Sequence, residues 1–112
     1  MRILVVEDEE LVREVAVSVL EDAGHLVVEA ADGEQALELL RSSTFDALFT
    51  DIKLPGQDGW TVAEQFRAVF PDAPVIFATG YAPRYQAFAH SILLNKPYRA
   101  AQVLQALKKL AA

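Results

Sequence analysis

Short apolar runs alternate with amphipathic stretches along the whole chain. The apolar runs, at residues 3–6, 26–30, 47–51, 74–79 and 91–94, have the length and composition of buried strands. After each of them, apolar residues recur every three or four positions, which predicts helices. These helices are expected from Leu11 to Gly24, from Asp32 through Leu40, from near Trp60 to Pro71, over residues 83–90, and around Val103 to Leu110.

Strands that alternate with helices and short loops indicate an α/β fold, with a doubly wound parallel sheet and five flanking helices. At 112 residues, the chain is expected to form one domain, residues 1–112. Right-handed crossovers would bring the carboxyl ends of all strands to one edge of the sheet. The polar residues that follow these strands are therefore expected to meet: Glu7, Asp8, Asp51, Thr79 and Lys96.

Three of these five side chains are carboxylates. At about 5 Å and an effective dielectric of about 20, each like-charge pair costs roughly 3 kcal/mol, so the group needs a proton or a cation. Hard carboxylate oxygens suit Mg²⁺, which keeps part of its water shell and bridges to phosphate oxygens. Beside Mg²⁺, Asp51 can attack phosphorus as a nucleophile, while Lys96 and Thr79 stabilise the phosphoryl oxygens.

Composition restricts the partners and the compartment. The net charge of −6 argues against a surface that follows nucleic-acid phosphates. No apolar run reaches the roughly 20 residues of a membrane-spanning helix, and acidic residues interrupt the start too early for a signal peptide. The absence of cysteine excludes disulfides and thiol chemistry and fits a reducing compartment. We therefore expect a cytoplasmic location and no direct contact with nucleic acid or membrane.

Each candidate residue has a simpler interpretation when it is taken alone. An isolated Asp51 would be favoured as a turn or capping residue by roughly two to one, and Lys96 as a surface lysine. Glu9 and Glu10 are interpreted as the acidic first turn of a helix. His25 and His90 are distant from the acidic residues in the chain and are interpreted as ordinary surface or core histidines. The five residues at the strand ends, taken together, reverse the interpretation of Asp51.

The combined pattern resembles the receiver domains of two-component response regulators. It consists of Glu7-Asp8 after the first strand, Asp51 with Pro55 and Gly59 after the third, Thr79-Gly80 after the fourth and Lys96-Pro97 after the fifth. The resemblance covers essentially the whole chain. Residues 77–81, Phe-Ala-Thr-Gly-Tyr, are further similar to a subgroup that includes stand-alone receivers and receivers of hybrid kinases.

The resemblance implies a flavodoxin-like sheet with strand order 2-1-3-4-5 and a role for each matching residue. Asp51 is implied as the phosphoacceptor, Thr79 as the switch hydroxyl and Lys96 as the cation that pairs with the phosphoryl group. Mg²⁺ would be held by Glu7, Asp8, Asp51 and the backbone carbonyl of Lys53. A cis peptide before Pro97 would aim Lys96 into the site.

The implied function is phosphorelay signalling. Asp51 would accept a phosphoryl group from a histidine kinase or a histidine phosphotransfer protein and thereby shift the domain between two states with different protein contacts. The output face would comprise the fourth helix, the fifth strand and the fifth helix, about residues 82–110, with Ala87, Phe88 and Ala89 as candidate contacts. We expect no enzymatic activity beyond self-phosphorylation and self-dephosphorylation.

Two departures from the common receiver pattern concern the switch and the phosphorylated lifetime. Leu93 stands where many receivers carry an inward-turning Phe or Tyr, so Tyr81 or Tyr98 is expected to take part of that role. The positions that tune the lifetime carry Lys53 and Tyr81. Both are large, which predicts slow self-dephosphorylation and a shorter lifetime after Tyr81→Ala.

Several alternatives remain open from the sequence. The chain is expected to be a stand-alone receiver, but it is also consistent with a receiver taken from a hybrid histidine kinase or a longer regulator. A degenerate receiver would act as a constitutive interaction module. A metal-dependent phosphatase is disfavoured because Lys53, rather than an acidic residue, lies two residues beyond Asp51. A flavodoxin-like nucleotide binder is disfavoured because acidic residues occupy the loop after the first strand.

Overall fold

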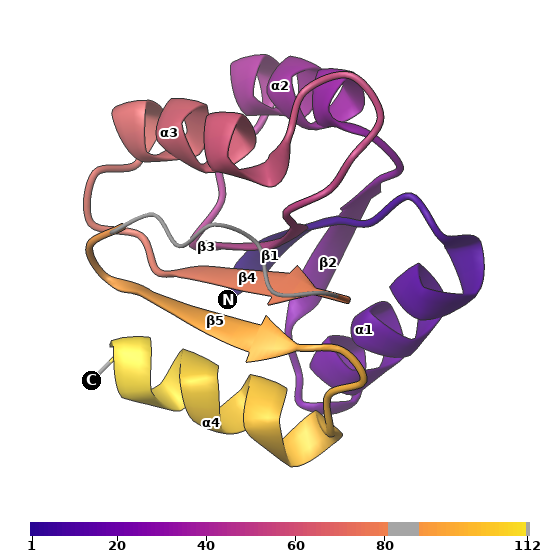
Figure 1. Ribbon diagram of the computed structural model, residues 1–112. Coiled ribbons are helices and arrows are strands. Elements are labelled where there is room, and N and C mark those ends of the chain that lie inside the picture. The colour runs from indigo at the N-terminus through magenta and orange to yellow at the C-terminus, as the bar shows by residue number, and fades with distance from the viewer. Residues whose placement is uncertain (81–87, 112) are drawn as a thin grey trace.

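The computed structural model describes residues 1–80 and 88–111. Five parallel strands form one sheet in the order β2-β1-β3-β4-β5, which confirms the predicted topology (Figure 1). The strands are β1 (Arg2–Val6), β2 (Leu26–Ala30), β3 (Ala47–Asp51), β4 (Val75–Thr79) and β5 (Ser91–Asn95). The helices in the described residues are α1 (Glu10–Asp22), α2 (Gly33–Ser42), α3 (Gly59–Val69) and α4 (Ala100–Ala111).

The three central strands are mostly apolar because both of their faces are buried, and their polar residues stand at or near their ends. Along β1, Ile3 and Val5 belong to one core, whereas Leu4 and Val6 belong to the other. The same alternation divides Phe77 of β4 from Ile76. Side chains of successive strand residues point to opposite faces, so a continuous apolar run supplies both cores at once.

The helices cover the two faces of the sheet in pairs. Figure 1 shows α2 and α3 together on one face and α1 and α4 on the other. The core under α2 and α3 is centred on Phe66 and Phe77, with Trp60 packed on the Phe77 ring at a centroid distance of 4.4 Å. The opposite core includes Leu20 of α1 and Val103 of α4. Both layers hold the sheet rigidly beneath the loops that follow its strands.

Side chains define the starts of α2 and α3. Asp32 accepts a hydrogen bond from the Gln35 amide at 2.8 Å, and the Gln35 side chain accepts one from the amide of Ala31 at 2.9 Å. This reciprocal arrangement resembles a capping box, except that Gln35 bonds to the amide one residue before the N-cap Asp32. At α3, Asp58 accepts from the amide of Thr61 at 2.9 Å. The helix therefore begins immediately after the loop that follows Asp51.

Two parts of the structure differ from the periodicity of the sequence. Leu11 and Val15 lie on the apolar stripe expected for α1, yet they are 76% and 58% exposed, and the helix buries Ala16 and Leu20 instead. The helix expected over residues 83–90 falls mostly on residues 81–87, which lie outside the described residues. Its last part is not helical, because Phe88 to His90 lead directly into β5.

In the described part of the chain, no helix has both the length and the apolar character needed to cross a membrane.

Candidate functional site at the carboxyl edge of the sheet

The carboxyl ends of the strands bring together the polar residues that the sequence singled out. Asp51 is the last residue of β3 and Thr79 the last of β4, while Glu7 and Asp8 directly follow β1. Lys96 follows β5 by one residue. The parallel register aligns these ends, since Asp51 pairs with Ala78 and Thr79 pairs with Asn95. The predicted edge site is therefore present.

The three carboxylates form one group of oxygen atoms. One oxygen from each of Glu7, Asp8 and Asp51 lies within 4.8 Å of the other two. Glu7 and Asp51 are buried, with exposures of 3% and 7%, whereas Asp8 is open to solvent. A group of oxygens this close, buried at its base and open at one side, fits a hard divalent cation such as Mg²⁺ that retains several waters.

Lys96 provides the positive charge inside this group. Its Nζ donates a hydrogen bond to Oδ2 of Asp51 at 2.8 Å and another to Oε1 of Glu7. The backbone holds the lysine in place, because the amide of Lys96 donates to the carbonyl of Thr79 at 2.7 Å. The peptide bond between Lys96 and Pro97 is cis, as the resemblance to receivers implied. One ammonium thus offsets part of the repulsion between two buried carboxylates.

Burial and pairing act in opposite directions on these groups. Burial raises the pKa of the Glu7 carboxyl above its usual range, although hydrogen bonds from Lys96 and from the amide of Glu9 act to lower it. Burial is also the largest effect on Lys96 and acts to lower its pKa. The hydrogen bonds and charges of Asp51 and Glu7 together outweigh burial, so the net pKa of the Lys96 ammonium is raised. Lys96 therefore remains a cation in the site.

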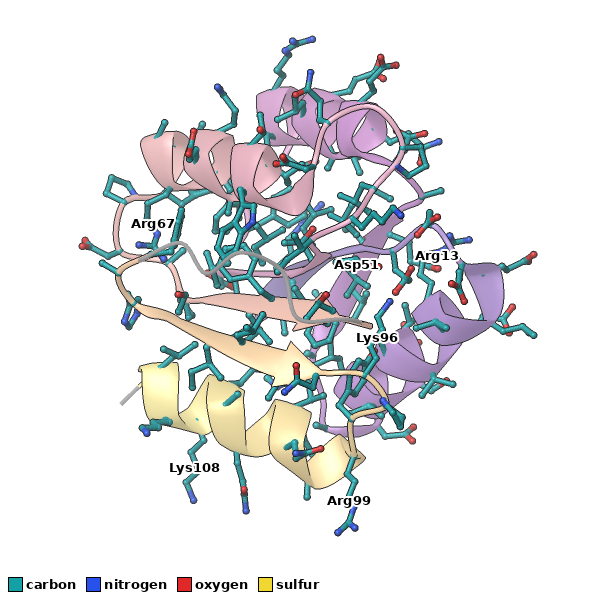
Figure 2. All side chains as sticks on the ribbon, viewed as in Figure 1. Arg13, Asp51, Arg67, Lys96, Arg99 and Lys108 are labelled. Atoms are coloured by element: carbon teal, nitrogen blue, oxygen red, sulfur yellow. The ribbon has the colours of Figure 1, made fainter. Side chains whose placement is uncertain are left out.

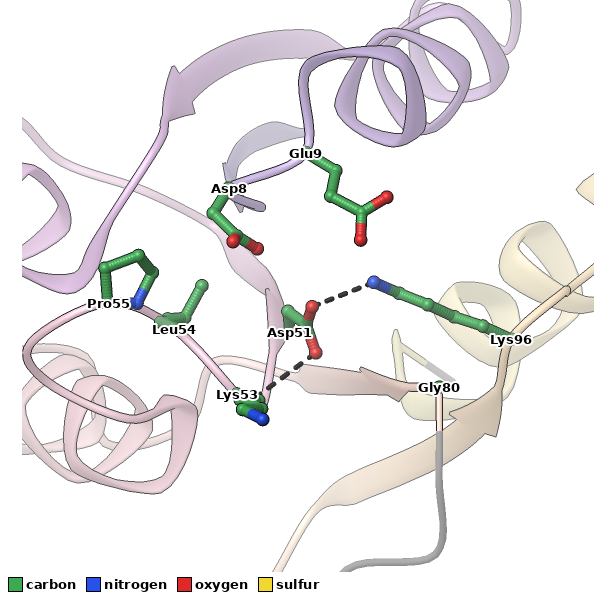
Figure 3. A pocket seen from close by; sticks show the side chains of 8 residues that line it. All are labelled: Asp8, Glu9, Asp51, Lys53, Leu54, Pro55, Gly80 and Lys96. Carbon is green, nitrogen blue, oxygen red and sulfur yellow. Dashed lines mark hydrogen bonds and ion pairs between the residues drawn. The ribbon is translucent and has the colours of Figure 1, made fainter.

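A cavity of about 480 Å³ opens beside Asp51 (Figure 3). Its lining comes from the end of β3 and from the loops after β1, β3, β4 and β5: Asp8, Glu9, Asp51, Lys53, Leu54, Pro55, Gly80 and Lys96. Figure 3 shows the carboxylates of Asp8 and Asp51 and the ammonium of Lys96 directed toward one another across this space. The cavity is large enough for a phosphoryl group with hydrated metal, and its walls offer both charge signs.

The loop after β3 turns its backbone toward Asp51. The amide of Lys53 donates to Oδ1 of Asp51 at 3.4 Å, and the amide of Gly59 donates to the carbonyl of Ile52 at 2.7 Å. The Lys53 side chain is exposed at the rim of the cavity. Its backbone is therefore near the phosphoacceptor candidate, while its exposed side chain belongs to the cavity lining.

The predicted switch residues occupy different environments. Thr79 is buried, with an exposure of 1%, and Leu93 of β5 is 37% exposed. Tyr98 is half-buried and packs edge-on against Phe49 at a centroid distance of 5.6 Å. Burial raises the pKa of the Tyr98 phenol, and the nearby charge of Lys96 partly offsets that effect. Tyr81 lies outside the described residues, so its proposed role remains a prediction.

The sequence did not predict the contact of two residues, Arg13 and Glu29, that support the site. Arg13 of α1 donates from Nη1 to the carbonyl of Glu7 at 2.8 Å and from Nε to Oε1 of Glu29 at 3.1 Å. The signal was present in the sequence as an arginine on the first helix and a glutamate within a strand, a position where glutamate is disfavoured. Only the packing of α1 against the sheet shows that the two side chains meet.

Comparison with known proteins identifies the family. The model of the response regulator receiver domain matches residues 3–108. The chain therefore belongs to the response regulator receiver domain family, and this fold and this group of residues define a phosphorelay signalling module. The finer similarity to the subgroup with the Phe-Ala-Thr-Gly-Tyr motif stays a prediction.

Curated relatives include short and long proteins. The chain is 32% identical over 114 residues to the response regulator receiver protein CpdR of Brucella abortus, covering 97% of this chain and 95% of CpdR. It is 34% identical over 117 residues to the sensor kinase CckA of the same organism, covering 96% of this chain. The chain spans only 12% of the length of CckA. Receiver sequences of this kind thus occur both as nearly whole proteins and as parts of kinases.

Solved structures show the same fold. A response regulator receiver protein from Sinorhizobium medicae is 33% identical, with a TM-score of 0.93 and coverage of 98% of this chain and 93% of that one. The response regulator TrrA from Thermotoga maritima, solved in complex with Mg²⁺ and BeF, is 31% identical, with a TM-score of 0.85 and coverage of 97% of each chain. The chain therefore shares the fold of these two receiver structures over nearly its whole length.

Proposed function

We propose that Asp51 accepts a phosphoryl group from a histidine kinase or a histidine phosphotransfer protein in the cytoplasm, with Mg²⁺ as cofactor, and that phosphorylation changes protein contacts. The observation that carries this proposal is the group of three carboxylates within 4.8 Å, with Lys96 bonded to Asp51 at 2.8 Å. A capping aspartate would need neither the two other carboxylates nor the lysine. The magnesium complex of the TrrA receiver supports the choice of metal.

The transfer is a displacement at phosphorus. A carboxylate oxygen of Asp51 would attack the phosphorus of phosphohistidine. As the new O–P bond forms, the N–P bond breaks, and its electron pair stays on the imidazole nitrogen, which takes a proton from water. Lys96 would hold one phosphoryl oxygen by its charge, and the hydroxyl of Thr79 would donate to another. This chain would therefore act on itself and would turn over no external phosphoester.

The metal would be held by Glu7, Asp8, Asp51 and the backbone carbonyl of Lys53. When bound, Mg²⁺ would neutralise negative charge on the phosphoryl oxygens, while these ligands would fix its position beside Asp51. Glu7 lies at the buried base of the site and would orient the other ligands from there. Asp8 is exposed at the open side, where metal and phosphodonor would enter.

Phosphorylation would act through Thr79, Leu93, Tyr98 and Tyr81. Thr79 is buried beside the site, and its backbone already contacts Lys96, so a shift toward the phosphoryl group would alter packing on β5. The output face would comprise β5, α4 and the residues before β5, and its binding partners would be proteins. A groove lined by Ile92, Leu94 and Ala106 on this face supports the choice.

Labelling with a small phosphodonor tests the proposal. Acetyl phosphate with Mg²⁺ should add one phosphoryl group to the wild-type chain, as detected by intact mass, and none to Asp51→Asn. Asp72→Asn, which changes an exposed aspartate in the turn after α3, serves as the matched control and should label normally. An unlabelled wild-type chain would instead favour a constitutive interaction module. Labelling of Asp51→Asn would place the acceptor elsewhere.

A further inference from the structure

Arg13 bonds to the acidic turn of Glu7, Asp8 and Glu9 but does not line the cavity. The turn is fixed at each end by backbone bonds: the amide of Glu7 donates to the carbonyl of Ala30 at 3.1 Å, and the amide of Arg13 donates to that of Glu9 at 2.9 Å. Between these points, Nη1 of Arg13 donates to the carbonyl of Glu7 at 2.8 Å. This carbonyl belongs to the peptide that joins Glu7 to Asp8, so its direction sets where both carboxylates can point.

Glu29 in turn holds the guanidinium. Its Oε1 accepts from Nε of Arg13 at 3.1 Å, and its position in β2 is fixed by pairing with Val5 of β1. The Arg13 side chain is 17% exposed, while that of Glu29 is 48% exposed. The planar fork of an arginine donates in fixed directions, so two acceptors on different elements leave it little freedom. Figure 2 shows Arg13 at the same end of the sheet as Asp51 and Lys96.

The guanidinium bonds to a backbone oxygen and leaves the carboxylate oxygens of the site to other partners. Glu7 uses its carboxylate toward Lys96 and toward the amide of Glu9. Arg13 therefore does not compete for the metal oxygens in the way that Lys96 does. Its contact resembles the outer partners that orient ligands around metal centres, whose loss typically weakens metal binding by about 10- to 100-fold.

We infer that Arg13, braced by Glu29, is a positioning residue that orients the Glu7–Asp8 peptide and thereby strengthens the binding of a divalent cation at the carboxylate site. The inference rests on the proposed function, because it assigns Glu7 and Asp8 as ligands. The inference predicts a change in Mg²⁺ affinity that is opposite to the change expected from charge alone. A cation that acted only through its charge would repel Mg²⁺, so its removal would tighten metal binding. A cation that positions the ligands has the opposite effect.

The test measures Mg²⁺ affinity by isothermal titration calorimetry on the wild type and four variants. Arg13→Gln should weaken Mg²⁺ binding about tenfold, the lower end of the usual range for lost orienting contacts. Glu29→Gln keeps an acceptor oxygen but removes the charge, so it should weaken binding less. The double variant should be no weaker than Arg13→Gln, because Glu29 acts through Arg13. Arg41→Gln removes the same charge from an exposed site at the end of α2 and should bind as the wild type does.

Unchanged or tighter Mg²⁺ binding by Arg13→Gln, or strictly additive losses in the double variant, would overturn the inference. A wild-type measurement avoids dependence on the folding of variants. In NMR spectra, the Nε–H of Arg13 should exchange with water more slowly than that of exposed Arg41 and should shift during Mg²⁺ titration with the calorimetric affinity. Fast exchange, or no response to Mg²⁺, would also overturn it. A wild-type chain that binds no Mg²⁺ would overturn the proposed function as well, whereas normal wild-type binding and labelling with unaffected Arg13 variants would overturn this inference alone.

Discussion

The backbone of Gly59 packs directly against the main-chain carbonyl of Asp51. A β carbon at residue 59 would lie 2.1 Å from that oxygen and 2.7 Å from the α carbon of Ile52. The amide of Gly59 also donates to the carbonyl of Ile52 at 2.7 Å. The first residue of α3 is thus in contact with the end of β3, and the loop between them closes beside the candidate phosphoacceptor.

Replacement of Gly59 by alanine should destabilise the fold and disturb the site. The atoms in the way belong to the backbone, so neither can rotate aside, and overpacking of this kind costs about 1–3 kcal/mol or more. Urea unfolding measures the loss in free energy, and labelling by acetyl phosphate should slow because the Asp51 backbone must shift. Gly80→Ala is the control for stability, since a β carbon there meets no atom of the described residues within 4 Å. Equal stability of the two variants would contradict the argument.

Arg67 joins the end of α3 to the segment that enters β5. Its Nη1 donates to the carbonyl of Ala89 at 2.7 Å, its Nη2 donates to that of His90 at 3.0 Å, and its guanidinium lies over the Phe88 ring at 4.9 Å from the centroid. Figure 2 shows Arg67 at the end of the sheet opposite to Lys96. It therefore stabilises the fold at a place remote from the chemistry.

Arg67→Ala should lower the free energy of unfolding by about 2–4 kcal/mol, because two charge-assisted hydrogen bonds and a ring contact are lost. The amide of Val75 donates to the carbonyl of His90 at 3.3 Å and should exchange faster with solvent in this variant. Arg41→Ala provides a match, since it also removes an arginine from the last turn of a helix. Mg²⁺ affinity should not change in either variant. Weaker Mg²⁺ binding by Arg67→Ala would show that the contacts of Arg67 with residues 88–90 also affect the carboxylates.

Much of the fold could be predicted because the strands are buried on both faces. Continuous apolar runs such as Val75 to Ala78 have few alternatives to a central parallel strand, and the polar residue after each run marks the same edge. The start of α2 is likewise marked by a local pattern, since Gln35 follows Asp32 by three residues. The sequence therefore predicts that Asp51, Lys96 and the acidic pair lie close together, because a parallel sheet brings the carboxyl ends of its strands to one edge.

The supporting contacts could not be predicted, because they join elements through side-chain directions that periodicity does not specify. The apolar spacing on α1 includes Leu11 and Val15, yet both are exposed since the helix turns Ala16 and Leu20 to the sheet. Local sequence does not distinguish Arg13 and Arg67 from ordinary helix-surface arginines. Each reaches backbone carbonyls of a distant segment, and only the packed structure shows which carbonyls are within reach.

Lys96 bonds to the oxygens of Glu7 and Asp51 that the proposed metal would also use, and this predicts opposite effects of Lys96→Met on two properties. Mg²⁺ should bind several-fold more tightly, because a cation no longer shares the site. Without Mg²⁺, the protein should lose about 1–3 kcal/mol of stability at neutral pH, since two buried carboxylates lose a charged donor. Labelling by acetyl phosphate should become slower if the ammonium holds the phosphoryl group.

Calorimetry, urea unfolding with and without Mg²⁺, and labelling rates test these effects separately. Lys108→Met removes an exposed lysine from the last turn of α4 and should change none of the three. Added Mg²⁺ should restore more stability to Lys96→Met than to the wild type, because metal replaces the missing charge. Weaker Mg²⁺ binding by Lys96→Met would mean that the lysine organises the site rather than competes for it.

Tyr98 offers a pH-dependent readout of the switch. Burial raises the folded-state pKa of its phenol above the ordinary value of 10.0. The folded protein therefore holds this proton more tightly than the unfolded chain does, so the contribution of Tyr98 to stability is complete below pH 10 and is lost as the pH rises through the folded-state pKa. Carbon-13 NMR of the tyrosine ring should record this raised pKa, with Tyr98→Phe assigning the signal. The same variant should lose less stability than the wild type above pH 10, because it has no phenol to ionise.

If Tyr98 takes over the aromatic role that Leu93 cannot perform, addition of Mg²⁺ and beryllofluoride, a mimic of the phosphoryl group, should change the surroundings of Tyr98 and move its pKa. An unchanged pKa in the presence of the mimic would exclude Tyr98 from the switch and leave Tyr81 as the remaining tyrosine candidate.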